Sequence, residues 1–379
     1  MAREKGASTL NILVLNTGSA TLKCSIVDGS SNRRLHSEVV AWSSAAGDAV
    51  PPLPALPPDA HHLTFDAVAH RVVHGGADYS GPTRVDSAAL QAIESASALA
   101  PLHNPPALSI IRAAMARYPD LPQIAVFDTA FHHDLPAHAR YYAVPAHWFE
   151  QYGVRRYGFH GISHASVARQ AAVLLQRPLH ELRLVTLHLG SGASATAIAG
   201  GRSIDTSMGM TPLEGLVMGT RSGDLDIGAA LRVAGREGLS PDQLERVLSH
   251  ESGLKGLCGD ADLRAILARS ETGDLQAEQA LAIYCYRIRK YIGAYMAALG
   301  GLDALVFTGG VGENAATVRA RACEGLGSLG IVIDRHENEL RCSGEARAIH
   351  AAGAAVAVLI APSDEDLEIA RQTQDLLQT

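Results

Sequence analysis

The sequence predicts an α/β fold of two domains that arose by duplication, and three observations support this prediction. The chain has 379 residues, which exceeds what a single core usually organises and favours two domains of about 150 to 200 residues. A strand, tight turn and return strand occurs twice, about 170 residues apart. Glycine-rich turns follow predicted strands at three places. We therefore expect a nucleotide cleft between the two domains.

The first half of the chain reads as a hairpin followed by alternating helices and strands. Residues 10–15 and 22–27 are apolar runs typical of paired strands, with residues 16–21 as the turn between them. Pro105 and Pro106 end one helix and open the next. The further elements expected here are a strand at 66–73, a helix at 86–98, a helix at 107–118 and a strand at 124–127.

The second half repeats the hairpin, with strands near 184–187 and 193–199 around the turn His188–Gly192. The helix at 240–248 has Ser240, Pro241 and Gln243 at its start, which is a capping-box pattern. Apolar positions in Leu275–Leu299 recur with a helical period. The remaining predictions are helices at 163–175, 225–234, 315–325 and from 363 to the end, and strands at 302–307 and 354–360.

We place the change of domain between residues 135 and 136. The N-terminal domain then comprises residues 1–135, and the C-terminal, nucleotide-binding domain comprises residues 136–364. We expect the last helix, residues 365–379, to pack back on the N-terminal domain.

Composition excludes several classes of protein. A net charge of −7 and an isoelectric point near 6.2 argue against nucleic acid as a partner. The five cysteines are scattered and form no CxxC pair, which argues against a disulfide framework or a zinc site. The N-terminus has no apolar signal core, and no run is long enough to span a bilayer. A cytoplasmic protein that contacts no membrane is expected.

The stretch between residues 187 and 226 is the best candidate for a functional site. Its part after residue 205 is polar, rich in glycine and too long for a simple connection. Turns at 16–23, 188–192 and 309–314 follow strands and suit a phosphate chain, although one such turn alone would be weak evidence. No GxxxxGK[ST] motif occurs. The pattern resembles the duplicated ATPase architecture of sugar kinases, actin and Hsp70, a ribonuclease H-like fold.

Nine longer motifs, in sequence order, resemble those of the acetate kinase family. They cover the chain from about residue 10 to its end, and they read NTGSATLK (16–23), HRVVHGG (70–76), APLHNPP (100–106), VFDTAFH (126–132), RRYGFHGISH (155–164), HLGSGAS (188–194), DTSMGMTPLEGLVMGTRSGDLD (205–226), FTGGVGENA (307–315) and PSDEDLEIA (362–370). The resemblance implies reversible transfer of the γ-phosphoryl group of ATP to acetate, which gives acetyl phosphate and ADP.

The resemblance implies that Arg71 and Arg221 bind acetate and the transferred phosphoryl group, and that His160 stabilises the transition state. The planar guanidinium fork suits both carboxylate and phosphate oxygens. Asp128 is implied as a catalytic residue. A general-base role is not needed, because acetate is already ionised at pH 7, so we expect Asp128 to orient Arg71 or a metal-bound water. Direct in-line transfer is the simpler mechanism, and a phosphoenzyme on Glu365 or His160 stays open.

The resemblance also implies the residues that hold the cofactors. Asn16 and Glu365 match the positions of a Mg²⁺ site, with Mn²⁺ as an alternative, and oxygen ligands suit either ion. An acidic residue in a first helical turn is also expected from the helix dipole alone. The positions implied for ATP or ADP are Lys23, His188, Leu189, Gly190, Ser191, Gly192, Asp262, Leu263, Arg264, Gly310, Val311, Gly312, Glu313 and Asn314.

Four apolar residues match the pocket for the acetate methyl group: Val73, Leu102, Phe159 and Pro212. Valine at position 73 narrows the pocket and favours acetate over propionate, although one methylene discriminates by only about 1 to 3 kcal/mol. The same four residues are equally compatible with an ordinary core.

Two positions depart from the family pattern. Ser191 stands where asparagine is common, and Ala20 stands where serine is common; we expect altered nucleotide affinity with activity retained. The alternatives are a propionate or butyrate kinase, and an ATP-binding protein of the actin and Hsp70 kind that is not a kinase. A homodimer is implied by the resemblance, with Leu275–Leu299 as a candidate contact.

Overall fold

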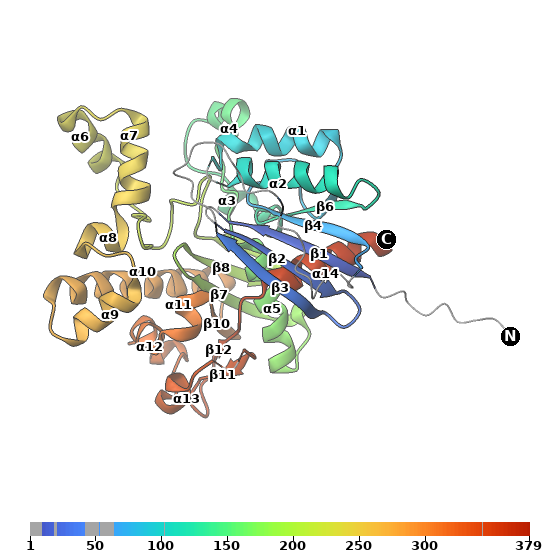
Figure 1. Ribbon diagram of the computed structural model, residues 1–379. Helices are drawn as coiled ribbons and strands as arrows, with labels where there is room; N and C mark the ends of the chain where they lie inside the picture. Colours follow the sequence, from blue (N-terminus) through green and yellow to red (C-terminus); the bar gives the residue numbers. More distant parts are fainter. Residues whose placement is uncertain (1–9, 19–20, 42–52, 54–63, 102, 343) are drawn as a thin grey trace. The chain divides into compact units, whose positions relative to one another are not determined.

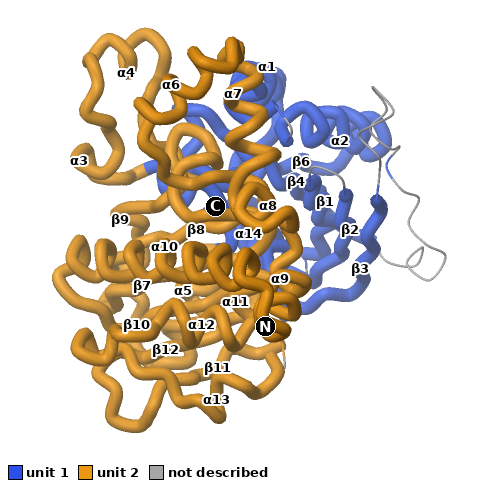
Figure 2. The backbone as a smooth tube through the Cα atoms, turned by 90° about the vertical axis from the view of Figure 1, so that its left-hand side faces the viewer, with its two compact units in different colours: residues 1–133, 159–163, 364–379 blue, residues 134–158, 164–363 orange. Residues whose placement is uncertain are grey.

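The chain forms two compact units (Figure 2). The structure is a computed structural model that describes residues 10–18, 21–41, 53, 64–101, 103–342 and 344–379. Unit 1 comprises residues 1–133, 159–163 and 364–379, and unit 2 comprises residues 134–158 and 164–363. The units therefore differ from the expected division because the short segment 159–163 groups with unit 1. The domain boundary after residue 135 stays a prediction.

Unit 1 contains a six-stranded mixed sheet in the order β3-β2-β1-β4-β6-β5 (Figure 1). Strands β1, β4 and β6 are parallel to one another, and β2, β3 and β5 run antiparallel to their neighbours. The bounds are β1 Asn11–Thr17, β2 Thr21–Asp28, β3 Arg33–Ala41, β4 Ala67–Val72, β5 Thr83–Arg84 and β6 Gln123–Phe127. The central parallel strands are largely apolar and buried because both faces of the sheet are covered.

Unit 2 repeats this topology strand for strand. Its sheet has the order β11-β12-β10-β7-β8-β9, which read in reverse matches the first sheet, including the parallel centre and the antiparallel edges. Both sheets also have a register shift between the second and third strands of the meander. The bounds are β7 Arg183–Leu189, β8 Ala193–Ala199, β9 Arg202–Thr206, β10 Ala304–Thr308, β11 Arg347–Ala348 and β12 Ala357–Ile360. The predicted duplicated α/β fold is confirmed.

Helices cover both faces of the first sheet. Alternate residues of β1 point to opposite faces, so that Ile12 packs in a core with Ile369 of helix α14 (Glu365–Gln378), whereas Leu13 packs in a core with Ile110 of helix α2 (Asn104–Arg117). Helix α1 (Ser87–Ser95) begins at the N-cap Asp86 and contacts α2. Helix α14 contacts β1, β2, β4 and β6.

The long helix α10 (Leu275–Leu299) organises the helical part of unit 2, with α8, α9, α12 and β8 packed against it. The predicted capping box at Ser240 is present. No helix in the described ranges is both long and apolar enough to cross a bilayer. The other helices are α3 Ala137–Arg140, α4 Ala146–Tyr152, α5 Gly161–Leu175, which begins in unit 1, α6 Ile227–Glu237, α7 Pro241–Arg246, α8 Gly253–Cys258, α9 Leu263–Glu271, α11 Gly309–Asn314, α12 Ala316–Cys323 and α13 Arg335–Glu339.

The glycine-rich segment after β10 is a helix and not the turn that its composition predicts. Gly309 has a φ of +77°, and a Cβ there would lie 2.7 Å from the Leu189 carbonyl oxygen, so the chain turns at this residue alone. The next residues form α11. The Asn314 side chain donates to the Gly310 carbonyl at 2.9 Å, and the Glu313 carboxylate accepts from the Gly309 N–H at 3.1 Å. These side-chain bonds stabilise a short helix that propensity alone disfavours.

Candidate active site

In unit 1, the ends of the parallel strands bring Arg71 and Asp128 together. Arg71 Nη2 lies 2.6 Å from Asp128 Oδ2 and Nε lies 3.2 Å from Oδ1, so the contact is bidentate. Arg71 also donates to the Thr17 carbonyl at 3.3 Å, and its Nε lies 3.6 Å from Glu365 Oε2. Desolvation raises the pKa of Asp128, and Glu365 adds to this rise although Arg71 opposes it. The carboxylates raise the pKa of Arg71 against the effect of burial. This guanidinium is therefore a fixed positive charge.

The backbone of His160 is held in an unusual conformation beside Asp128. His160 has a φ of +57°, which is uncommon for a residue with a side chain. The peptide after it is tied to the Asp128 carbonyl by the Gly161 N–H at 2.9 Å, and a Cβ at Gly161 would lie 2.2 Å from that oxygen. On the other side, His132 Nε2 donates to the Phe159 carbonyl at 3.1 Å. Strain of this kind collects at functional sites.

A cluster of oxygen atoms surrounds Asn16 at the end of β1. The Asn16 amide donates to Glu365 Oε2 at 3.2 Å and to Asp366 Oδ1 at 3.1 Å. Lys23, implied for ATP by the family resemblance, lies in unit 1 with Nζ 2.9 Å from Asp366 Oδ2. Among the described residues, no three His, Cys, Asp or Glu side chains converge as metal ligands. The donor set consists of hard oxygens only, which fits Mg²⁺ with most positions left to water.

In unit 2, the positive charge of Arg221 forms no ion pair with any carboxylate among the described residues. Its Nη1 donates to the Pro212 carbonyl at 3.2 Å and lies 3.6 Å from Met218 Sδ. Within the described part of the chain, it has no salt bridge to Asp or Glu, and desolvation lowers the pKa of its guanidinium. A partly buried arginine with only neutral contacts is suited to an anionic ligand. Two predicted site residues, Arg221 and Pro212, are thus in direct contact.

Three side chains that the sequence patterns do not single out fix the turn before Arg221. Arg156 Nη2 lies 2.7 Å from Glu214 Oε1, and the Tyr142 hydroxyl donates to Glu214 Oε2. That hydroxyl also accepts from the Met210 N–H at 3.1 Å. A Cβ at Gly209 would come within 1.9 Å of Glu214 Oε2, so a larger residue there would displace this carboxylate. Arg156 stands inside a quoted motif, but its partners are distant in sequence.

A cavity of about 600 Å³ in unit 2 collects many of the positions implied for the nucleotide. It lies between the β7–β8 turn, the start of α9 and helix α11. The predicted residues that line it are Gly190, Ser191, Asp262, Leu263, Arg264, Gly310, Val311 and Asn314. Lining residues that the sequence analysis missed are Gly219, Leu254, Ala261, Leu267, Tyr284 and Ala315. Their apolar character, supplied by separate elements, suits the flat face of a base.

Five of the other positions implied for the nucleotide belong to elements that border this cavity, although they do not line it, and the sixth, Lys23, lies in unit 1. His188, Leu189 and Gly192 belong to the β7–β8 hairpin, and Gly312 and Glu313 belong to α11. Glu313 Oε1 also accepts from the Ser363 N–H at 2.9 Å, which gives this side chain a structural role. Asp262 caps α9 and lies 2.6 Å from Arg264 Nη2, and hydrogen bonds from Arg264 lower the pKa of Asp262 to about 2.

The apolar residues implied for the acetate methyl group are only partly accounted for. Val73 and Phe159 are buried, and the Phe159 ring contacts His74 edge-on at a centroid distance of 5.6 Å. Leu102 and the departure at Ala20 lie outside the described residues. These four residues as a methyl pocket stay a prediction.

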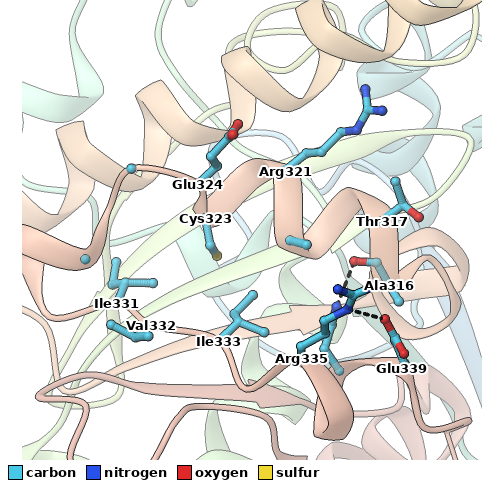
Figure 3. A pocket seen from close by; sticks show the side chains of 14 residues that line it. Ala316, Thr317, Arg321, Cys323, Glu324, Ile331, Val332, Ile333, Arg335 and Glu339 are labelled. Atoms are coloured by element: carbon cyan, nitrogen blue, oxygen red, sulfur yellow. Dashed lines mark hydrogen bonds and ion pairs between the residues drawn. The ribbon is translucent and has the colours of Figure 1, made fainter.

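A second cavity of about 640 Å³, also in unit 2, has no predicted site residue in its lining (Figure 3). Ile331, Val332 and Ile333 form its apolar side, and Arg335 lies against Glu339 with Nε 3.0 Å from Oε1. Arg321 is paired with Glu278 at 2.7 Å. Because these arginines are paired within the protein, this cavity lacks the unneutralised charge found at Arg221.

Comparison with known proteins identifies what the chain is similar to. The model of the acetokinase family matches residues 58–371. An acetate kinase of Sulfurovum sp. (strain NBC37-1) is 45% identical over 393 aligned residues, covering 96% of this chain and 98% of the relative. An acetate kinase of Syntrophobacter fumaroxidans is 52% identical over 309 residues, covering 82% of this chain and 75% of the relative.

Solved structures agree with these similarities. The crystal structure of Porphyromonas gingivalis acetate kinase superposes with a TM-score of 0.86 at 36% identity, covering 97% of this chain and 100% of that one. A propionate kinase from Francisella tularensis superposes with a TM-score of 0.87 at 35% identity, covering 97% and 99%. The fold is thus shared by kinases named for two different carboxylates.

Proposed function

The chain belongs to the acetokinase family, and on that premise we propose that it is an ATP:acetate phosphotransferase. The reaction is acetate plus ATP giving acetyl phosphate plus ADP, and it runs in both directions. One carboxylate oxygen of acetate forms a bond to the γ-phosphorus while the bond from that phosphorus to the β,γ-bridging oxygen breaks. No proton has to leave the nucleophile, because acetate is ionised at neutral pH.

The observation that carries this proposal is the uncompensated charge of Arg221. The transferred phosphoryl group spreads negative charge over its equatorial oxygens, and catalysis depends on fixed positive groups aimed at them. Arg221 holds a partly desolvated guanidinium against the neutral Pro212 carbonyl, without a carboxylate partner in the described ranges. A substrate anion supplies the missing counter-charge, so we assign the phosphoryl group in transfer to Arg221.

Arg71 differs because its charge is already shared with carboxylates. The bidentate contact from Asp128 fixes the direction of the guanidinium, which leaves Arg71 as a rigid partner for acetate. We assign to Asp128 the orientation of Arg71 and not proton abstraction. His160, strained and tied on both sides to the segment that follows β6, is the proposed further contact to the transition state.

We propose that Asn16 and Glu365 hold Mg²⁺ through oxygen atoms and bound waters, with Mn²⁺ as a substitute. When bound, the ion would supply positive charge that neutralises the phosphates. The chain's own contribution is to orient Glu365, through the contacts of its carboxylate with Arg71 and the Asn16 amide. The cavity lined by Gly190, Arg264 and Gly310 is the proposed nucleotide site.

We further propose that the protein is a cytoplasmic homodimer. We propose α6 as the contact between the two subunits, in place of α10. The apolar stripe of α10 is buried inside its own unit, against α8, α9 and α12. Helix α6 contains no buried residue, and two of its large apolar side chains are exposed to solvent. Ile227 is 74% exposed, and Leu231, one helical turn later, is 61% exposed. A second copy is the occupant expected for such a face in this family. All five cysteines are unpaired, which suits a reducing compartment.

The test is the formation of acyl phosphate, trapped as hydroxamate, from ATP and Mg²⁺ with acetate, propionate or butyrate. We expect acetate to react fastest, with slower turnover of propionate. Arg221→Ala should lower kcat about 10³-fold or more, because it removes charge that is needed only in the transition state. Arg71→Ala should lower kcat/KM for acetate by a similar order.

The matched control is Arg112→Ala, which removes an exposed arginine that is paired with Glu94 and lies outside the site. This variant should retain the wild-type kcat. Faster reaction with propionate than with acetate would reassign the acceptor. No acyl phosphate from any acid, with ATP still bound and hydrolysed, would move the chain to the ATP-binding proteins of the actin and Hsp70 kind.

A further inference from the structure

A short segment after helix α7 forms hydrogen bonds with the backbone on both sides of Arg221. The Thr220 carbonyl accepts from the Ser252 N–H at 3.1 Å, and the Ser222 N–H donates to the Leu248 carbonyl at 3.0 Å. The Thr220 hydroxyl donates to the Ser249 carbonyl at 2.9 Å. The two peptides that flank Arg221 are thus fixed by residues about 30 positions further along the chain.

Two more backbone bonds extend the same contact. The Gly219 carbonyl accepts from the Lys255 N–H at 2.9 Å, and the Met218 carbonyl accepts from the Leu254 N–H at 3.0 Å. Met218 in turn donates its N–H to the Arg221 carbonyl at 3.1 Å. This segment, residues 248–255, overlaps a π-helical turn over Val247–Glu251, a rare geometry that is frequent near functional sites.

Gly253 lies at the closest point of this contact. Its φ is +61°, and a Cβ there would lie 2.3 Å from the Met218 carbonyl oxygen, 2.6 Å from the Arg221 carbonyl oxygen and 2.9 Å from the Arg221 nitrogen. All three neighbours are backbone atoms, so they cannot rotate away as a flexible side chain could. Any side chain at Gly253 must push the Arg221 backbone aside.

We infer that residues 248–255 are the positioning element for Arg221, with Gly253 as the residue that sets its backbone. This inference rests on the proposed role of Arg221 in phosphoryl transfer. Within the described ranges, the hydrogen bonds of the Arg221 side chain go to the Pro212 carbonyl and the Met218 sulfur, and neither fixes a guanidinium strongly. The direction of the Arg221 guanidinium therefore depends on where the backbone places the Arg221 Cα. A displacement of about 1 Å in a catalytic group can lower a rate about 100-fold.

The test is a double-mutant cycle between Gly253→Ala and Arg221→Ala, measured as kcat for acetyl phosphate formation and as the dissociation constant for ATP. Gly253→Ala should lower kcat about 10- to 100-fold in the wild-type background and change ATP affinity less than threefold. In the Arg221→Ala background, the same substitution should lower kcat less than twofold, because the group that it displaces is absent.

Gly238→Ala is the matched control, because Gly238 has a nearly equal φ of +68° but nothing within 4 Å of its added Cβ. It should cost similar backbone strain and leave kcat unchanged. Equal kcat for the two alanine variants, or an equal loss from Gly253→Ala with and without Arg221, would overturn the inference. A wild type without acetyl phosphate formation would instead overturn the proposed function.

A second variant covers the case in which Gly253→Ala does not fold. Thr220→Val keeps the shape of the side chain and removes only the hydrogen bond to the Ser249 carbonyl. We expect a three- to tenfold lower kcat with unchanged ATP affinity, and no further loss in the Arg221→Ala background. An unchanged kcat in this variant would contradict the role of the segment.

Discussion

At the residue scale, the two site arginines differ in what surrounds them. Arg71 is 13% exposed and bound by Asp128, which is 1% exposed, so its geometry is fixed before any ligand arrives. Arg221 is held by a carbonyl and a sulfur atom and retains its charge for an anion. A pair of arginines with these properties can separate the two tasks of an acyl kinase, orientation of the acceptor and neutralisation of the phosphoryl group.

His70 gives a prediction about pH and stability. Burial lowers the pKa of this histidine to about 4, although a hydrogen bond to Gln123 opposes the shift. The unfolded chain binds this proton below about pH 6.5, so between pH 6.5 and 4 the unfolded state binds more protons than the native state. The free energy of unfolding is therefore unaffected by protonation of His70 above about pH 6.5. It falls as the pH decreases to about 4, and the total decrease is at most about 3 kcal/mol.

The measurement for His70 is urea unfolding at pH 7.5, 6, 5 and 4.5 for the wild type and His70→Gln, which keeps a polar group near Gln123. The variant should lose less free energy of unfolding on acidification than the wild type. Parallel pH curves for the two proteins would show that His70 does not carry this dependence.

At the scale of elements, the docking of helix α14 depends on a buried carboxylate. Asp366 is 1% exposed and accepts from Ser25 Oγ at 2.6 Å, with Lys23 Nζ at 2.9 Å and the Asn16 amide at 3.1 Å. Apolar contacts such as those of Ile369 fix the face of α14, and Asp366 fixes its register on the sheet. The helix in turn carries Glu365 to the end of β1.

Asp366→Asn should lower the free energy of unfolding by about 2 to 4 kcal/mol, because it leaves Lys23 without its buried counter-charge. Denaturant unfolding measures this loss. The control is Asp375→Asn on the same helix, where the ion pair with Arg371 is largely exposed and a change within about 0.5 kcal/mol is expected. A loss as small in Asp366→Asn as in the control would refute the docking role.

At the scale of the whole molecule, duplication explains why the site residues are spread along the sequence. Each copy of the sheet ends its central parallel strands at one edge, and each copy places polar or glycine residues there: Asn16, Arg71 and Asp128 in unit 1, and His188 and Gly309 in unit 2. The carboxyl ends of parallel strands are where open α/β sheets bind ligands. Thus two equivalent edges carry different sets of residues.

The assembly is tested by Leu231→Asp on α6. A charge on this exposed apolar face should convert a dimer to a monomer at micromolar concentration, measured by light scattering after gel filtration. Leu275→Asp on α10, where Leu275 is 83% exposed, should leave the dimer intact. The reverse result would return the contact to α10, and a monomeric wild type would remove the proposal.

The fold class and the main elements can be predicted from residue patterns because the information for them is local. Apolar runs of strand length, the capping box at Ser240 and the helical period of Leu275–Leu299 each depend on neighbours within a few residues. The motifs also identified the family. The short helix α11 was missed because its stability comes from side-chain bonds of Glu313 and Asn314, which override the low helix propensity of its glycines.

Which charges are neutralised, in contrast, follows from contacts that form only in the folded chain. Arg71 and Arg221 look alike in sequence, but Asp128, 57 positions away, pairs with the first, while the second has no carboxylate among the described residues. The same holds for Gly253, whose contact with the Arg221 backbone follows no local pattern. Such relations depend on distances between segments far apart in the chain, and residue spacing along a sequence does not encode them directly.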